Sequence, residues 1–209
     1  TFYLNSDGSM QVGWAKISGS WYYFETSGKM RKSKLSEKQR NYYFDNSGRL
    51  CKTEILIERV QQRYNQWCWA ACSEMVGTYT INNATITQTD IVKKIHGSLL
   101  DKSGTASDVV NAIKYASNYT KNPTSLLGSL SYSQVVDKLD ANHPIVIGIL
   151  WNGGGGQMVV SAGFDKNTKK VQIIDPWKNC ATNYYSFQEI CLGVELQSGS
   201  GYCNEMVVY

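Results

Sequence analysis

The stretch Gln62-Arg-Tyr-Asn-Gln-Trp-Cys68-Trp69-Ala70-Ala71-Cys72-Ser73-Glu74-Met75-Val76 decides how this chain of 209 residues is interpreted. It opens with polar and aromatic residues and continues as a run of good helix formers, which places Cys68 at or just inside a helix N-terminus. A thiol there experiences the positive end of the helix dipole and free backbone N–H groups, which favour the thiolate. Alternatively, Cys68 and Cys72, four residues apart, are small buried residues on one helical face.

Two neighbours of Cys68 favour the reactive interpretation. Gln62 lies six residues before it and Trp69 directly after it. The string resembles papain-like cysteine peptidases, in particular a bacterial branch with a C-W-A-A core, similar to secreted effector proteases and the C39-like group. The resemblance implies that Cys68 is the nucleophile, and that the Gln62 side-chain amide and the Cys68 backbone N–H stabilise the oxyanion. Gln61 and Gln66 are alternative sources of that amide.

The same resemblance locates the catalytic base. In the family, the histidine starts a strand in a pattern like G-G-H-x-V-V-x-x-G-Y/F-D. This chain reads Gly155-Gly156-Gln157-Met158-Val159-Val160-Ser161-Ala162-Gly163-Phe164-Asp165, so the catalytic histidine position holds Gln157. The residue that orients the imidazole corresponds to Asp175, in Asp175-Pro176-Trp177. We also expect Trp69, Trp151, Trp177 and the loop Gly153–Gly156 to border the substrate groove.

The chain has two histidines, His96 and His143, and neither is in the expected place. His96 ends a predicted helix, where a cation favours the dipole, and His143 lies at the head of a strand where the family has variable polar residues. A neutral amide cannot accept and return a proton near pH 7. We therefore predict that Cys68 is chemically modifiable while peptide cleavage is very slow or absent. Two origins of Gln157 stay open: a substitution that traps the enzyme, or a natural pseudo-peptidase.

The hydrophobic pattern changes period along the second part of the chain. Helices are predicted at 88–95, 105–116 and 131–140, with Ser107 and Ser131 or Ser133 near the N-caps. Strands are predicted at 144–151, 157–164 and 170–175, with an edge strand at 206–209. Helices followed by an antiparallel sheet predict an α+β fold, as in papain.

The first fifty residues repeat with a period of 20. The copies are Thr1-Phe-Tyr-Leu-Asn-Ser-Asp-Gly-Ser-Met10, Trp21-Tyr-Tyr-Phe-Glu-Thr-Ser-Gly-Lys-Met30 and Asn41-Tyr-Tyr-Phe-Asp-Asn-Ser-Gly-Arg-Leu50. Each has aromatic or β-branched residues, a polar turn ending in Gly8, Gly28 or Gly48, and a returning strand, which predicts β-hairpins. A lone hairpin is marginally stable, so the copies must stack.

The run from Gly13-Trp14 through Trp21-Tyr22-Tyr23-Phe24 to Met30 resembles choline-binding, or cell-wall-binding, repeats of Gram-positive surface proteins. Such repeats hold a quaternary ammonium against several ring faces. The resemblance implies a cage of Trp14, Trp21 and either Tyr42 or Tyr43. The next copy has Ser33-Lys34 in place of Gly-Trp and Asn41 in place of Trp, so at most one complete site is expected. The alternative is that these aromatics only pack hairpins together.

The amino-acid composition argues against several other classes of protein. Apolar residues make up 42% and charged residues 18%, which is typical of a globular protein. The net charge is +4 and the basic residues are scattered along the chain, so there is little reason to expect a nucleic-acid partner. We find no apolar stretch approaching 18 residues and no signal peptide. Because the chain opens within a repeat at Thr1, we interpret it as a segment of a longer protein whose signal peptide lies upstream.

Six cysteines favour an oxidising compartment, and their spacing argues against zinc. We expect at least one disulfide among Cys180, Cys191 and Cys203. The two units are predicted at 1–52 and 53–209, packed directly against each other because no flexible linker separates them.

These patterns predict a secreted, cell-wall-associated cysteine peptidase, or its disabled form, with a peptide or protein substrate and with choline or a cell-wall polymer as partners. No cofactor, metal or transmembrane segment is expected. Two alternatives stay open: a non-enzymatic binding protein or adhesin, and a different acyl transfer such as transamidation.

Overall fold

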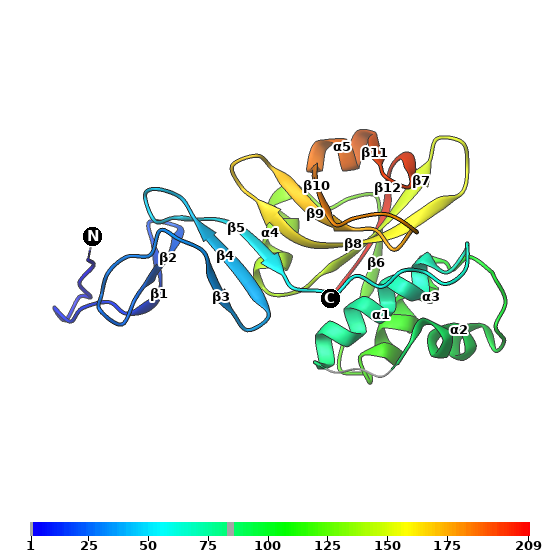
Figure 1. The fold of residues 1–209 in the computed structure, drawn as a ribbon, viewed down its shortest axis with the longest axis horizontal. Coiled ribbons are helices and arrows are strands. Elements are labelled where there is room, and N and C mark those ends of the chain that lie inside the picture. The colour runs from blue at the N-terminus through cyan, green and yellow to red at the C-terminus, as the bar shows by residue number, and fades with distance from the viewer. Residues whose placement is uncertain (1, 83–85) are drawn as a thin grey trace.

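The computed structural model describes residues 2–82 and 86–209, and Figure 1 shows hairpins leading into a larger unit of helices and sheet. Thr1, which opens the first repeat copy, lies outside the described residues. The predicted α+β architecture is confirmed, because one group of helices covers one side of a large antiparallel sheet (Figure 1). Within the described residues, no helix has both the length and the apolar character needed to cross a bilayer.

The helices are α1 (Cys68–Ile81), α2 (Gln88–His96), α3 (Ala106–Ala116), α4 (Tyr132–Asp140) and α5 (Phe187–Leu192). The strands are β1 (Gly13–Ile17), β2 (Ser20–Phe24), β3 (Leu35–Glu37), β4 (Arg40–Phe44), β5 (Leu50–Ile55), β6 (Thr124–Leu127), β7 (Ile145–Trp151), β8 (Gly156–Asp165), β9 (Lys170–Ile174), β10 (Asn183–Ser186), β11 (Val194–Leu196) and β12 (Gly199–Val208).

Capping boxes start three of the helices. Thr87, Thr105 and Ser131 each accept a bond from the N–H three residues on, and the third residue's side chain bonds back to the cap. The three predicted helices are confirmed to within one residue at each end. The expected cap Ser107 was wrong: Thr105 holds that position, because Asp108 completes its capping box.

Strand β8 is the centre of the sheet. Its first half pairs with β7 and its second half with β5 on the same edge, while β9 pairs along the opposite edge. Beyond β7 lies β12, whose far edge pairs with β11 and β6. The strand predicted at 206–209 is therefore the end of a ten-residue interior strand. Its alternating pattern is weak because it contains Gly199, Gly201 and a bulge between Cys203 and Glu205.

Helix α1 packs between the sheet and α3. Trp69, Ala70, Ala71 and Cys72 are fully buried. Gly77 lets α1 and α3 approach closely, because a Cβ there would lie 2.4 Å from Cβ of Ala116. This packing fixes the start of α1, and therefore Cys68, against β8.

The repeats form fewer complete hairpins than expected. The clearest hairpin joins β1 and β2 through Ser18 and Gly19, while the turn ending in Gly28 closes a single bridge between Phe24 and Met30. In the third copy, the turn ending in Gly48 does join two full strands, β4 and β5. The difference arises because β5 has a second strand to pair with.

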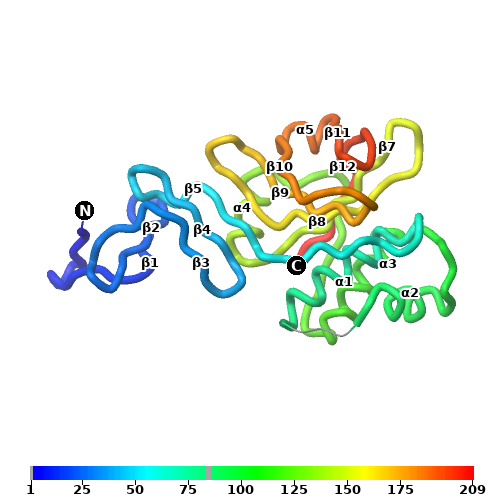
Figure 2. The backbone as a smooth tube through the Cα atoms, in the orientation of Figure 1, coloured from blue at the N-terminus to red at the C-terminus, as the bar shows by residue number. Residues whose placement is uncertain are grey.

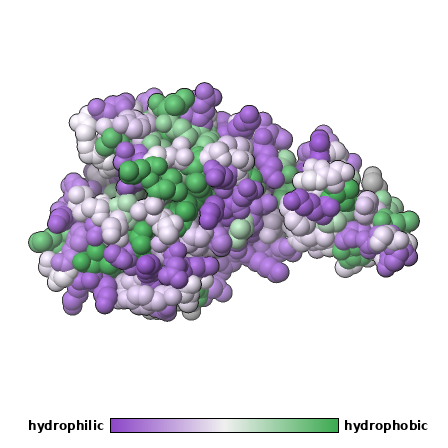
Figure 3. Space-filling view, turned by 180° about the vertical axis from the view of Figure 1, so that it is seen from behind, coloured by the Kyte–Doolittle hydropathy of each residue, from purple (hydrophilic) through white to green (hydrophobic). Residues whose placement is uncertain are grey.

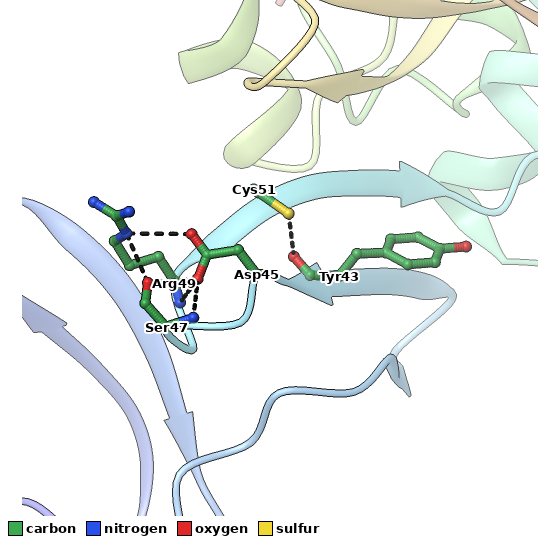
Figure 4. A network of polar contacts seen from close by, with 5 residues as sticks. All are labelled: Tyr43, Asp45, Ser47, Arg49 and Cys51. Carbon is green, nitrogen blue, oxygen red and sulfur yellow. Dashed lines mark hydrogen bonds and ion pairs between the residues drawn. The ribbon is translucent and has the colours of Figure 1, made fainter. Parts of the chain in front are cut away.

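The turn of the third copy is held by side chains as well as by Gly48 (Figure 4). Asp45 accepts bonds from the backbone N–H groups of Ser47 and Arg49 at 2.8 and 3.0 Å, and from the Arg49 guanidinium at 3.2 Å. Gly48 has φ of +83°, which favours glycine. Met30 of the preceding copy lies over Gly48, as Met10 lies over Gly28, so each methionine fills the space left by the next turn's glycine.

The repeats and the larger unit share one sheet. β5 begins at Leu50, the last residue of the third repeat copy, and its residues Lys52–Glu54 pair with Gly163–Asp165 of β8. Arg40 is buried, and its guanidinium donates to the carbonyls of Leu139 and Asp140 at the end of α4, at 2.7 and 2.8 Å. Figure 2 shows the continuous path from the repeats into the sheet, and Figure 3 shows the repeats projecting from the larger unit in the view from behind.

The expected disulfide was wrong, because all six cysteines are free. The thiols of Cys191 and Cys203 donate to separate oxygens, Ser129 Oγ at 3.3 Å and the Gly128 carbonyl at 3.6 Å. Cys180 lies elsewhere, near Asp175; burial of the Cys180 thiol and the Asp175 charge raise its pKa to about 11.

We predict that Gly48→Ala destabilises the repeats more than Gly8→Ala. Both glycines have positive φ, which costs alanine about 1 kcal/mol. Only at Gly48 would the new Cβ also meet a methionine, 2.6 Å from the Met30 sulfur, and overpacking adds about 1–3 kcal/mol. Urea unfolding followed by tryptophan fluorescence measures the difference. Equal losses in the two variants would show that the methionine contact carries no energy.

Candidate active-site cleft

Gln157, at the start of β8, connects two other segments. Its side-chain amide donates to Gln62 Oε1 at 3.0 Å and to Asp175 Oδ1 at 3.1 Å. All three side chains are buried, with exposed fractions of 5%, 6% and 4%. The structure therefore brings together three of the four residues singled out as catalytic, although they are 95 and 18 residues apart.

Asp175, which follows β9, is surrounded by neutral donors. Its Oδ1 also accepts the Trp177 backbone N–H at 2.9 Å, and its Oδ2 accepts the Ser198 hydroxyl at 2.5 Å. Arg59 binds the backbone carbonyls of Asp175 and Trp177 and so fixes the loop. These donors satisfy a carboxylate that is removed from water.

Gln62 is held by its backbone and by its side chain. Its N–H donates to the Pro176 carbonyl at 2.9 Å. Both hydrogens of its side-chain amide are used, because Nε2 donates to the carbonyls of Tyr64 and Asn65 at 2.9 Å each. In this conformation Gln62 presents its oxygen to Gln157, so its amide must turn before it can donate to an oxyanion.

Cys68 is the first residue of α1 and lines a cleft of about 320 Å³ together with Gln157. Burial raises the pKa of the Cys68 thiol, and the Asp175 charge adds to this, while the N–H groups of Met158 and Trp69 oppose it. The expectation that the helix start favours the thiolate is therefore corrected: desolvation outweighs the helix-end donors, and no cation among the described residues lowers the pKa of this thiol. The cleft is lined by Gln66, Cys68, Ser103, Gly104, Gly148, Ile149, Leu150, Gly155, Gly156, Gln157, Met158, Asn204 and Glu205.

The three tryptophans expected at the groove are not among its lining residues. For Trp69 the expectation was wrong: it is fully buried, its indole N–H donates to the Lys102 carbonyl, and its ring packs on Gly104. Trp151 packs against Gly199 and Gly201 of β12. Trp177 lies half-buried beside Asp175, whereas Gly155 and Gly156 of the expected loop do line the cleft.

Neither histidine lies in the cleft lining. His96 ends α2, with its ring 4.8 Å from that of Trp69 and its Nε2 3.8 Å from Asp108. His143 packs on Tyr209 and lines a separate pocket beside Tyr79, near the end of α1. Cys68 is at the other end of this 14-residue helix, about 20 Å away along its axis. His143 is thus too far to serve as a substitute base.

Sequence reasoning missed Ser198, Arg59 and Glu205. Ser198 and Glu205 lie on or beside β12, whose pairing with β7 connects residues at least fifty positions apart. A short segment with a glycine and a serine gave no signal for contact with Asp175. Arg59 lies in an irregular segment between the units, where no periodic pattern indicates a partner.

The repeats contribute a second pocket, of about 500 Å³, where they meet α4. Trp14, Trp21 and Tyr42 line it, and the Trp14 ring lies 6.3 Å from that of Trp21 and 4.7 Å from that of Tyr42. Glu37 accepts the Trp14 indole N–H at 2.9 Å. Tyr43, the alternative to Tyr42, is not among the lining residues and instead donates to Glu54 at 2.6 Å.

The fold and the cleft define a class of protein: a papain-like cysteine peptidase fold, with a thiol at a helix start opposite a buried polar pair on the sheet. The chain belongs to the family of the papain-like cysteine protease AvrRpt2, whose sequence profile matches residues 51–190. A profile of the choline-binding repeat matches residues 1–35 and 11–54. Both resemblances seen in the sequence are confirmed. No curated protein matches the chain.

Several solved structures are similar. The peptidase domain of Streptococcus ComA, a bifunctional ABC transporter involved in quorum sensing, is 17% identical; the match covers 73% of this chain and 96% of that domain, with a TM-score of 0.50, which shows the fold alone. The choline binding domain of Spr1274 from Streptococcus pneumoniae is 38% identical over 23% of this chain and 76% of that domain, with a TM-score of 0.22.

A third similar structure is choline binding protein F from Streptococcus pneumoniae, solved in the presence of a peptidoglycan analogue. It is 29% identical over 31% of this chain, with a TM-score of 0.23. This chain spans 19% of the length of that protein.

The raised pKa of Cys68 predicts its alkylation profile. Because only the thiolate reacts, we expect the rate of iodoacetamide labelling at Cys68 to keep rising above pH 9, without a plateau near neutral pH. In Gln157→His, an imidazolium beside the sulfur would stabilise the thiolate and move the rise to lower pH; Gln157→Ala should not. Peptide mapping by mass spectrometry assigns the label. A neutral-pH plateau in the unaltered chain would contradict the burial effect.

Proposed function

We propose that this protein is a cell-surface papain-like cysteine peptidase whose hydrolytic step is disabled by Gln157. The observation that carries the proposal is the pair of hydrogen bonds from the Gln157 amide to Asp175 and Gln62. They support Gln157 as the residue at the base position and Asp175 as the residue that would orient a base.

The chemistry follows from the proton that must move. Attack by Cys68 on a peptide carbonyl requires loss of the thiol proton and its later transfer to the leaving amine. An amide can do neither, and the burial of Cys68 keeps its thiol protonated. Loss of the base in such a catalytic unit lowers the rate by about three to six powers of ten.

A non-enzymatic binding role is the second candidate. It is favoured by the combination of a cleft that remains open beside Cys68 and a base position occupied by a neutral donor. Such a protein would capture peptides or proteins as a natural pseudo-peptidase or adhesin. The two roles differ in the outcome that they predict for the Gln157→His variant.

The proposal includes secretion and association with the cell wall, in a Gram-positive bacterium. Its support is the choline-binding repeat family of residues 1–54 and the aromatic pocket of Trp14, Trp21 and Tyr42. The quaternary ammonium of choline cannot donate a conventional hydrogen bond, so ring faces and nearby carboxylates suit it. We further propose that the repeat unit spans 1–52 and the peptidase unit 53–209.

We predict that Gln157→His gives the protein peptide hydrolysis. The imidazole would occupy the position from which Gln157 bonds Asp175, and it would accept the Cys68 proton. Cleavage of a quenched fluorogenic peptide library should rise by at least about 1,000-fold over the unaltered chain.

The double variant Gln157→His with Cys68→Ala is the matched control and should be silent. Incorporation of a labelled amine instead of hydrolysis would favour transamidation. If the Gln157→His variant folds and is labelled by iodoacetamide at Cys68, but neither cleaves peptides nor incorporates the amine, the binding role replaces the peptidase role.

We also predict that choline quenches or shifts tryptophan fluorescence and that Trp14→Ala abolishes the change, because Trp14 contacts both other cage aromatics. Tyr43→Phe is the matched control, since Tyr43 bonds Glu54 outside the pocket. A titration of each variant with choline chloride, with sodium chloride as the ionic-strength reference, measures the effect. An unchanged choline response in Trp14→Ala would show that Trp14, Trp21 and Tyr42 do not form a choline site.

A further inference from the structure

A carboxylate lies in the cleft beside the proposed nucleophile. Glu205 of β12 is registered opposite Gly148 of β7, which is registered opposite Met158 of β8. The three residues form one row across three strands, so about 10 Å separates the outer two backbones. The Met158 N–H faces the Cys68 sulfur, which places Cys68 at one end of the row and Glu205 at the other.

Gly148 leaves room for the Glu205 side chain over β7. A Cβ on Gly148 would lie 2.7 Å from Cγ and 3.1 Å from Oε1 of Glu205. The glutamate therefore lies over β7, in space that exists because residue 148 has no side chain. Glu205 and Cys68 line the same cleft.

The carboxylate has no matching charge in the cleft. Glu205 is the single charged side chain among the described residues that line it, and it forms no ion pair with any described residue. It is half-buried, and this burial raises the pKa of its carboxyl group. A partly desolvated anion without a partner is stabilised by a cation that enters the same space.

We propose that Glu205 makes this cleft selective for a cationic side chain, lysine or arginine, in the bound peptide close to the carbonyl that Cys68 faces. The inference rests on the proposed function, because it assigns a specificity to that same cleft. The other lining residues are neutral, and Gln66, Ser103 and Asn204 leave the ammonium or guanidinium group without a competing charge.

The selectivity can be measured on the unaltered chain without catalysis. Three methanethiosulfonate reagents of similar chain length carry a cationic aminoethyl, a neutral hydroxyethyl and an anionic sulfonatoethyl group. The Cys68 thiolate attacks the sulfur of the reagent, a disulfide forms, and methanesulfinate leaves. Rates at Cys68, followed by mass spectrometry and corrected for each reagent's rate with free cysteine, report the local potential. The Cys68→Ala variant shows which part of the mass-spectrometric signal comes from labelling at Cys68.

We expect the cationic reagent to react about five- to tenfold faster than the neutral one, and the anionic reagent to react more slowly. A rate difference of this size is expected at low salt when one negative charge lies within about 10 Å of the sulfur. Glu205→Gln should remove this preference. Glu195→Gln, which removes an exposed carboxylate on the neighbouring β11, is the matched control and should keep it.

A preference that is missing, or that persists in Glu205→Gln, overturns the inference and leaves the proposed function intact. A Cys68 that reacts with none of the three reagents overturns both, since the cleft would then be closed. In Gln157→His, kcat/KM for peptides with lysine or arginine near the cleaved bond should exceed that for glutamine at the same position, and Glu205→Gln should reduce this ratio.

Discussion

The side-chain amide of Gln157 joins the segment before α1 to the loop after β9. One hydrogen is donated to Gln62, which precedes α1, and the other to Asp175. Because all three groups are buried, each would lose its partner if the others moved, and an unpaired buried polar group costs about 1–3 kcal/mol. The cleft thus depends on the hydrogen bonds of Gln157 with Gln62 and Asp175. In this structural role a glutamine is sufficient, although it cannot transfer a proton.

The same network explains the ionisation of the thiol. A buried carboxylate beside a buried cysteine disfavours the thiolate, and Asp175 acts on both Cys68 and Cys180 in this direction. In an active cysteine peptidase, an imidazolium between carboxylate and sulfur offsets both the charge and the desolvation. Here neutral donors from Gln157, Ser198 and the Trp177 backbone stabilise Asp175 instead. The carboxylate is satisfied, but the N–H groups of Met158 and Trp69 do not offset the burial of the Cys68 sulfur.

Local signals in the sequence predicted the main helices and the central strands, but not β6, β10, α5 or β11, and they singled out Gln157 and Asp175, whose side chains meet. Capping residues and apolar spacing located α2, α3 and α4, and motif spacing located Gln157 and Asp175. Long-range pairing was beyond such signals: nothing local indicates that β12 lies inside the sheet or that Ser198 meets Asp175. Trp69 failed as a groove residue because large aromatics are as suited to the core as to a cleft.

A shared sheet connects the aromatic pocket of the repeats to the cleft. β5 pairs with β4 of the last repeat copy and with β8, the strand that carries Gln157. Asp137 and Asp140 of α4 line the pocket beside Trp14, so a cation held there contacts both units at once. Arg40 already binds the end of α4, and its buried bonds resist rotation between the units. A ligand bound in the aromatic pocket would therefore fix the orientation of the cleft relative to that ligand. A shared sheet keeps the two units in one arrangement, which a flexible linker would not do.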